Sequence, residues 1–294
     1  MEFFLQVFVS GLMTGLMYSL VAIGFVLIYK ASGVFNFAQG SMVLAAALTF
    51  VSFREMEIGF AASLGITLVV MVLLGIAVER AALRHLVNTS LITLFMATVG
   101  LSSIVEGLAQ AVWGGEVHGL ELGIPDTALD IVGSFTVSTF DLFASGIVAV
   151  LVTGLALFFN KTRTGLYLRA IADGPVAALS VGVPMSRMVA VVWATAGVVA
   201  LVAGMLWGAR LGVQFTLSVV ALKALPVFVL GGFTSITGAI IGGLLVGAVE
   251  NLGEIYIGGI IGGGIQNWIP YAFALLVLLI RPSGLFGEKT VVRV

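Results

Sequence analysis

Long apolar runs separated by short polar breaks make up most of this sequence. Several runs approach the roughly 20 residues that an α-helix needs to cross about 30 Å of hydrocarbon, and they lack the two-residue alternation of membrane β-strands. The pattern therefore predicts an all-α, polytopic membrane protein with about nine (eight to ten) transmembrane helices. The expected spans are residues 3–29, 39–53, 59–78, 91–113, 140–159, 188–208, 215–230, 236–257 and 265–280.

The composition supports the same class, because 60% hydrophobic and 9% charged residues leave too little polar surface for a water-soluble domain. We expect one transmembrane domain over residues 1–294. The first run is too long for the core of a signal peptide, so we expect a retained helix. The net charge of −1 gives no reason to expect nucleic acid as a partner, and the chain has no cysteine for a disulfide or a thiolate metal site.

Basic residues predict the orientation, because short cytoplasmic loops retain Lys and Arg. Residues 160–187 carry four basic residues and one acidic residue, so this loop should be cytoplasmic. Residues 114–139 carry four acidic residues and no Lys or Arg, so this loop should be external. Alternation of nine spans through these loops places the N-terminus outside and the C-terminus in the cytoplasm.

Within the cytoplasmic loop, the sequence predicts a short helix that breaks at Gly174-Pro175 and a second short helix from Pro175 toward Gly182. Proline suits the first turn of a helix, and Asp173 or Gly174 can provide the N-terminal cap. The second helix would present a small, mostly apolar surface. Such a surface could dock into a cleft of a soluble partner, or the loop could lie at the lipid interface.

Glycines at four-residue spacing recur along the chain, and this spacing lets helix backbones approach closely. We interpret them as helix-packing positions that carry no information about a substrate. They are Gly11 with Gly15, Gly204 with Gly208 and Gly212, Gly238 with Gly242, and Gly243 with Gly247.

Catalysis and metal binding are not expected of this chain. It lacks the Gly-x-x-x-x-Gly-Lys-Ser/Thr run that cradles nucleotide phosphates. Its two histidines, His85 and His118, fall in predicted loops on opposite sides of the membrane. No Ser-His-Asp or His-x-x-x-His arrangement can be assembled convincingly, so we expect neither an enzyme nor a bound cofactor.

Six separated blocks resemble, in the same order, the permease subunits of the high-affinity branched-chain amino-acid ABC importers. Two positions depart from the family pattern: Gln39 stands where relatives often have His, and Thr237 stands where Pro is common. The blocks are Gly15–Phe25, Asn36–Gly40, Glu79–Arg84, Arg169–Asp173 followed by Gly182, Leu230–Ala239 and Arg281–Gly287.

The resemblance implies a multi-pass subunit of the bacterial inner membrane that forms a translocation pathway with a second, homologous permease. It also implies two cytoplasmic ATPase subunits, which bind ATP and Mg²⁺, and a periplasmic solute-binding protein that delivers the substrate. The family's coupling helix, which contacts an ATPase, falls on Arg169 to Gly182 of this chain. The coupling residues would be Arg169, Ala170, Asp173, Gly174, Pro175, Ala178 and Gly182.

Polar residues within apolar runs are the candidates for a substrate pathway, because a charge at the bilayer centre costs about 2.5 to 3.5 kcal/mol on insertion scales. They line a pathway, or they form buried structural pairs, contact the other permease or satisfy nearby backbone groups. The polar break between the first two spans, residues 36–40, is also costly, because polar groups at membrane depth lose their contact with water. The candidates are Asn36, Gln39, Glu106, Gln110, Lys223, Glu250 and Asn251.

Several functions remain compatible with these residues. Related permeases serve branched-chain amino acids, other amino acids, urea or short amides, and aromatic or carboxylic compounds. A gradient-driven secondary transporter or a channel also uses polar breaks in its helices. Such a protein has no need of a docking helix with a Gly-Pro break, whereas a scaffold that transports nothing leaves the polar residues in the spans unexplained.

Overall fold

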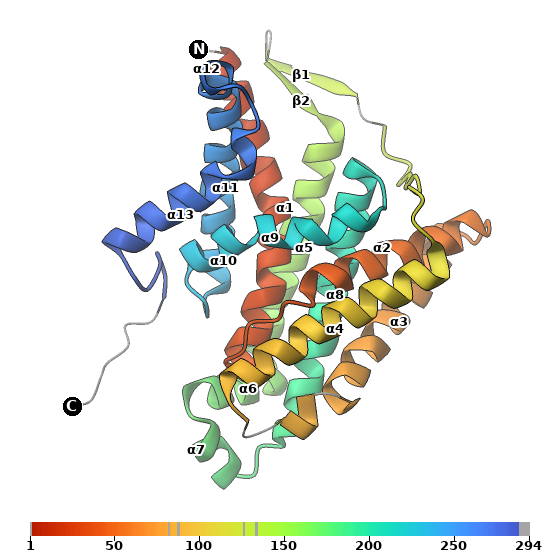
Figure 1. The fold of residues 1–294 in the computed structure, drawn as a ribbon, viewed down its shortest axis with the longest axis vertical. Coiled ribbons are helices and arrows are strands. Elements are labelled where there is room, and N and C mark those ends of the chain that lie inside the picture. Colours follow the sequence, from red (N-terminus) through yellow and green to blue (C-terminus); the bar gives the residue numbers. More distant parts are fainter. Residues whose placement is uncertain (1, 82, 87–88, 126, 133–134, 288–294) are drawn as a thin grey trace. The chain divides into compact units, whose positions relative to one another are not determined.

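The computed structural model describes residues 2–81, 83–86, 89–125, 127–132 and 135–287, and helices dominate it (Figure 1). In chain order the elements are α1 (Glu2–Ser32), α2 (Gln39–Glu55), α3 (Phe60–Ala81), the 3-10 helix η1 (Leu83–Leu86), α4 (Leu91–Trp113), β1 (Ala128–Val132), β2 (Phe135–Ser138), α5 (Thr139–Lys161), α6 (Arg163–Asp173), α7 (Pro175–Ser180), α8 (Met185–Leu211), η2 (Phe215–Val219), α9 (Val220–Lys223), α10 (Leu225–Gly231), α11 (Ile236–Tyr256), α12 (Gly258–Ile261), η3 (Ile265–Asn267) and α13 (Ile269–Ile280).

Six helices among the described residues are long and apolar enough to cross a membrane: α1, α3, α4, α5, α8 and α11. They confirm the predicted class, a polytopic helical membrane protein. The predicted count of about nine is not confirmed, because three expected spans fall on shorter helices. These are α2 with 17 residues, the apolar segment 215–231 and the apolar segment 269–280.

The segment 215–231 is divided among η2, α9 and α10, where the sequence predicts one span. Pro226 lies in the first turn of α10. Proline has no backbone N–H, so Pro226 cannot bond the carbonyl oxygen of Leu222 as a continuous helix would require, and the interruption between α9 and α10 falls at this missing bond.

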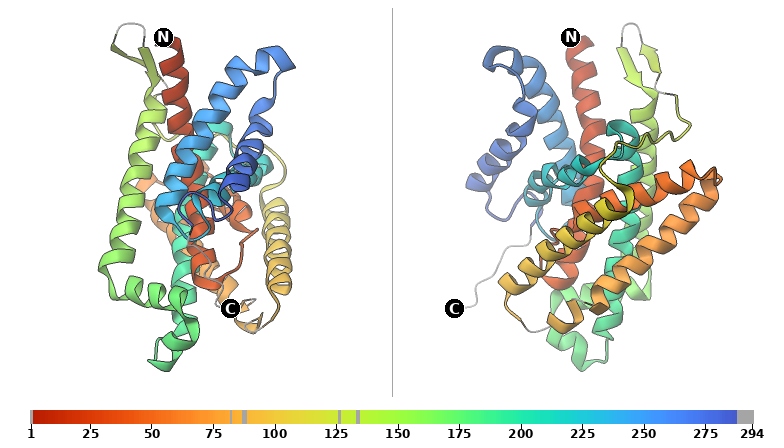
Figure 2. Two further views of the ribbon diagram at one scale, coloured as in Figure 1. Left: turned by 90° about the vertical axis from the view of Figure 1, so that its left-hand side faces the viewer. Right: turned by 45° about the vertical axis from the view of Figure 1, so that its right-hand side comes forward.

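A small hairpin departs from the all-helical expectation. Strands β1 and β2 pair antiparallel, with Ala128 opposite Ser138, and β2 leads directly into α5 (Figures 1 and 2). Strands of five and four residues offer too short an alternation for the hydrophobic pattern to reveal them. Residues 126 and 133–134 of the expected external loop lie outside the described residues.

The chain divides into two compact units, which we describe separately. Unit 1 comprises residues 1–26, 123–150 and 221–294, and unit 2 comprises residues 27–122 and 151–220. The single transmembrane domain expected for residues 1–294 stays a prediction.

Unit 1 is organised around a close contact between α1 and α11. A Cβ atom on Gly15 would overlap the carbonyl group of Gly243, and one on Gly247 would overlap the carbonyl oxygen of Gly11. Ser19 adds a hydrogen bond from its hydroxyl to the carbonyl oxygen of Ile240, at 3.3 Å. The four-residue glycine spacing therefore serves backbone packing here, as the sequence predicts.

Unit 2 is built on α8, which packs against α2 and α3. Small residues bring these backbones together: Gly75 faces the carbonyl group of Trp193, Gly197 faces Met71, and Gly204 faces Val43. By contrast, only 11% of the most apolar window of α4 is buried. Most of the α4 surface is thus open to lipid or to another subunit.

Candidate functional site

The polar break between α1 and α2 in unit 2 is held by Thr98 of α4. The Thr98 hydroxyl accepts the backbone N–H of Phe37 at 3.2 Å and lies 3.3 Å from the carbonyl oxygen of Phe35. The Asn36 side-chain oxygen accepts the backbone N–H of Ala38 at 3.0 Å. Asn36 is fully buried and serves the local backbone, which was one of its two predicted roles. Thr98 gave no sequence signal, because its partners lie about 60 residues away.

Gln39 differs from Asn36, although both side chains are completely buried. Neither the amide nitrogen nor the amide oxygen of Gln39 has a hydrogen-bond partner among the described residues. A buried polar group without a partner costs about 1–3 kcal/mol. Retention of such a group indicates a role outside folding.

Gln39 is also the first residue of α2, whose N-terminal cap, Ala38, makes no side-chain hydrogen bond. The first N–H groups of any helix lack acceptors within that helix, and the helix dipole places partial positive charge there. Half-helix ends of this kind face anionic substrate groups in transporters with broken helices. The Gln39 amide and the α2 terminus together could therefore bind a carboxylate, while the amide oxygen could accept an ammonium proton.

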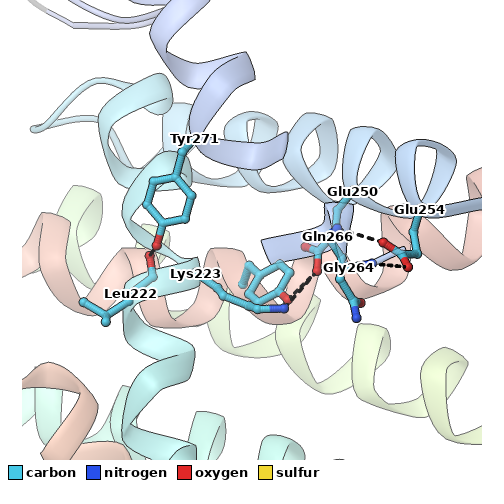
Figure 3. A network of polar contacts seen from close by, with 8 residues as sticks. Leu222, Lys223, Glu250, Glu254, Gly264, Gln266 and Tyr271 are labelled. Carbon is cyan, nitrogen blue, oxygen red and sulfur yellow. Dashed lines mark hydrogen bonds and ion pairs between the residues drawn. The ribbon is translucent and has the colours of Figure 1, made fainter. Parts of the chain in front are cut away.

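A second polar cluster lies in unit 1 (Figure 3). The Lys223 ammonium nitrogen is 3.3 Å from Oε1 of Glu250, and the Tyr18 hydroxyl donates to the same oxygen at 3.1 Å. The side chain of Glu250 is 5% exposed and that of Lys223 is 27% exposed. The pair neutralises both charges within apolar surroundings, and the ammonium group remains partly accessible. The structure thus joins two predicted site residues that are 27 positions apart.

Asn251, next to Glu250, is half-buried where α11 contacts α1. A Cβ on Gly11 would lie 3.2 Å from the Asn251 Cβ atom. Asn251 therefore adjoins the glycine contact, one residue away from the ion pair.

Glu254 holds the segment that follows α11. Its two carboxylate oxygens accept the backbone N–H groups of Gly264 at 3.0 Å and Gln266 at 2.9 Å (Figure 3). The Tyr271 hydroxyl donates to the carbonyl oxygen of Leu222 at 2.8 Å and so connects α13 to α9. The sequence pattern did not predict a role for these residues. One signal was available, because Glu254 lies one helical turn beyond Glu250 and precedes a glycine-rich segment.

Glu106 and Gln110 lie on α4, and neither side chain is fully buried. Glu106 is half-buried, and the Ser102 hydroxyl is 3.5 Å from its carboxylate. Gln110 is exposed. Their exposure suits contact with another subunit or an aqueous path outside this chain.

The predicted break in the loop 160–187 is present: α6 ends at Asp173, Gly174 caps α7, and α7 begins at Pro175. Among the predicted coupling residues, Asp173 and Gly182 are exposed, whereas Ala170 and Gly174 are half-buried. Ala178 is 3% exposed, Arg169 is half-buried, and the side chain of Pro175 lies outside the described residues. Among the described side chains of this loop, the large apolar ones that are exposed are Leu166, Tyr167, Leu179 and Val181.

A cavity of about 350 Å³ lies in unit 1 between the start of α1, the hairpin and the start of α5. Its polar lining includes Gln6, Ser10, Thr136 and the buried Asp141. None of the predicted site residues lines it. Across the described residues, no group of three or more His, Asp or Glu side chains is placed to hold a metal ion.

Several long apolar helices with buried polar groups define a helical membrane protein of the transport-permease class. A family model described as "Branched-chain amino acid transport system / permease component" matches residues 7–281. The chain therefore belongs to this family and is a permease component of an ABC importer.

The curated relatives match along nearly the whole chain. The chain is 29% identical over 315 residues to the high-affinity branched-chain amino acid transport system permease protein LivH of Escherichia coli (strain K12), with 99% of this chain and 98% of the relative covered. It is 26% identical over 305 residues to the corresponding protein BraD of Pseudomonas aeruginosa, with 99% and 98% covered.

A solved structure, "PsaBC from Streptococcus pneumoniae in complex with Fab", resembles this chain with a TM-score of 0.51. The likeness covers 95% of this chain and 92% of that chain at 14% sequence identity. At this identity it shows similarity of fold alone.

Proposed function

We propose that this chain forms, with a second homologous permease, the pathway by which an ABC importer moves branched-chain or related amino acids across the bacterial inner membrane. A periplasmic binding protein delivers the substrate, and two cytoplasmic subunits hydrolyse ATP. The N-terminus faces outward and the C-terminus faces the cytoplasm. The family supports the transport role, and the chemistry of the polar break supports the substrate class.

The observation that supports the substrate class is Gln39, a buried amide at the start of α2 that has no hydrogen-bond partner among the described residues. An amide is neutral, donates to a carboxylate and accepts from an ammonium group, so it suits a zwitterion. It would serve equally in any importer of small polar molecules, which leaves urea, short amides and carboxylic compounds as alternatives. In unit 1, Lys223 is a separate candidate for contact with a charged substrate group, since a quarter of its side chain is exposed.

The loop of α6 and α7 is the proposed coupling element. The side chains of Leu179 and Val181 are 54% and 79% exposed. They lie next to Gly182, whose backbone is in the left-handed region. Two apolar side chains at a tight turn suit a shallow cleft on an ATPase. Closure of the two ATPases would then move this loop and alternate access to the pathway.

Gentle purification of the tagged chain, followed by mass spectrometry of the bound proteins, tests the assembly. Two ATPases and a second permease are expected at stoichiometric levels. The complex is then reconstituted in liposomes with the binding protein, ATP and labelled leucine. Flux through the chain alone in ATP-free liposomes would overturn the proposal in favour of a channel or a secondary transporter.

Gln39→Leu tests the site. The variant removes a buried amide that no described residue satisfies, so the free energy of unfolding should stay the same or rise by about 1–3 kcal/mol. Leucine uptake should fall at least tenfold, with the assembly intact. The matched control is Gln266→Leu, because the Gln266 side chain is exposed and its bond to Glu254 uses the backbone. Lower stability with normal uptake would show that Gln39 serves folding.

A further inference from the structure

A narrow groove in unit 2 contains two positively charged residues in an otherwise apolar lining. It lies where α1 ends and α8 begins, beside α5 and α6. Among the described residues that line it, Lys30 of α1 and Arg169 of α6 are the charged ones. The remaining lining residues are apolar and include Leu27, Phe159 and Val192.

Neither cation has an ion-pair partner among the described residues. The Arg169 Nε atom is buried and has no hydrogen-bond acceptor in that part of the chain. A buried guanidinium N–H without an acceptor is costly, and two like charges beside one groove repel each other. Both costs fall when an anion binds between Lys30 and Arg169.

The place of the groove indicates where that anion comes from. Lys30 and Phe159 lie in the last turns of two apolar spans, and Val192 lies in the second turn of a third. Ends of apolar spans lie at the level of the lipid headgroups, where basic pockets between helices bind anionic lipids. The apolar walls also suit the start of an acyl chain.

The size of the groove restricts the ligand further. About 10 Å³ of the groove is open to the centre of a water-sized group, which is room for one such group. This space matches one phosphate oxygen and is smaller than a whole amino acid or nucleotide. The rest of the ligand must therefore remain outside the groove, as the body of a membrane lipid does.

We propose that this groove binds the phosphate of an anionic phospholipid, with one phosphate oxygen between Lys30 and Arg169. The lipid connects α6 to the end of α1, and it thereby fixes the loop 160–187 to the membrane surface. The site requires neither substrate nor ATP, so its test is independent of the transport proposal.

The test measures lipid retained by the purified full-length chain with its co-purifying subunits. The protein is placed in nanodiscs of phosphatidylcholine with increasing phosphatidylglycerol, and bound lipid is counted by native mass spectrometry. One phosphatidylglycerol per chain should remain bound, and phosphatidylcholine should not replace it. Equal retention of the two lipids would overturn the proposal.

Two double variants separate this site from general surface charge. Lys30→Gln with Arg169→Gln should weaken phosphatidylglycerol binding at least tenfold. Lys161→Gln with Arg163→Gln removes the same charge from exposed positions nearby and should change binding less than threefold. Equal weakening by the two double variants would mean that only the overall positive charge attracts lipid.

Two further measurements complete the design. Lys30→Gln alone, at the end of a helix, should weaken binding several-fold and covers the case in which the double variant does not fold. The second measurement adds inorganic phosphate at millimolar concentration, which should neither bind measurably nor displace the lipid. Displacement by inorganic phosphate would identify a free-phosphate site instead.

Discussion

Neutralising Glu250 alone should destabilise the protein more than neutralising both Glu250 and its partner Lys223. At the observed 3.3 Å, the attraction between the two charges is about 5 kcal/mol for an effective dielectric constant near 20. Glu250→Gln loses this attraction and leaves the Lys223 charge behind. The variant keeps a side-chain oxygen for the Tyr18 hydroxyl, so the ion pair is the main interaction removed.

The expected loss is smaller than the full attraction. Breaking a buried pair by removing one member costs about 3–5 kcal/mol. With 27% of its side chain exposed, Lys223 can regain part of its hydration. We therefore expect Glu250→Gln, and separately Lys223→Met, to lower the free energy of unfolding by about 2–4 kcal/mol. The double variant leaves neither charge of this pair in place and should lie within about 1 kcal/mol of the wild type.

The assay is reversible unfolding of the purified protein in mixed micelles, followed by tryptophan fluorescence, for the wild type and the three variants. Glu121→Gln, at an exposed position, is the control and should change stability by less than about 0.5 kcal/mol. A double variant as unstable as the sum of the two single variants would refute the coupling. Single variants as stable as the control would refute the pair itself.

Uptake by the same variants separates the two roles predicted for this pair. If the double variant regains stability and transports normally, the pair serves structure. If it regains stability but loses uptake, the charges act in the pathway.

Two further predictions concern unit 1. Gly15→Ala should lower the free energy of unfolding by about 1–3 kcal/mol, because its methyl group would overlap the backbone of Gly243. Gly146→Ala, where nothing lies within 4 Å, is the control, and equal stability of the two variants would contradict the close packing. Glu254→Gln should speed amide hydrogen exchange at Gly264 and Gln266, because the acceptor of both N–H groups loses its charge. Unchanged exchange at both amides would show that the carboxylate does not hold this segment.

The apolar runs were sufficient to predict the membrane class and most helix positions, because a helix that crosses hydrocarbon must be long and apolar. The α6–α7 break was also predictable, since a Gly-Pro pair acts through local backbone geometry. The glycine pairs identified surfaces for close packing. Their partners, such as Gly243 for Gly15, could not be predicted, because spacing along one helix says nothing about the neighbouring helix.

At the candidate sites, too, the sequence indicated which residues are unusual but not which residues they contact. The cost of charge in hydrocarbon marked Lys223 and Glu250 as unusual, but the 3.3 Å contact between them depends on how unit 1 folds. Asn36 and Gln39 are three residues apart and both fully buried, yet only Asn36 has its amide oxygen satisfied by the backbone. No sequence rule distinguishes the two residues, because the hydrogen-bond partners of each side chain depend on which residues the fold places around it.

By itself, the sequence determined that this protein lies in a membrane as helices, where its loops break and which polar residues are costly. These properties depend on the solvation of each segment and on local backbone preferences. The tertiary structure alone decided where the cost of burying a polar group is offset by a partner, as at Glu250, and where it remains, as at Gln39 and Arg169. That outcome depends on distances of a few ångströms between residues far apart in the chain.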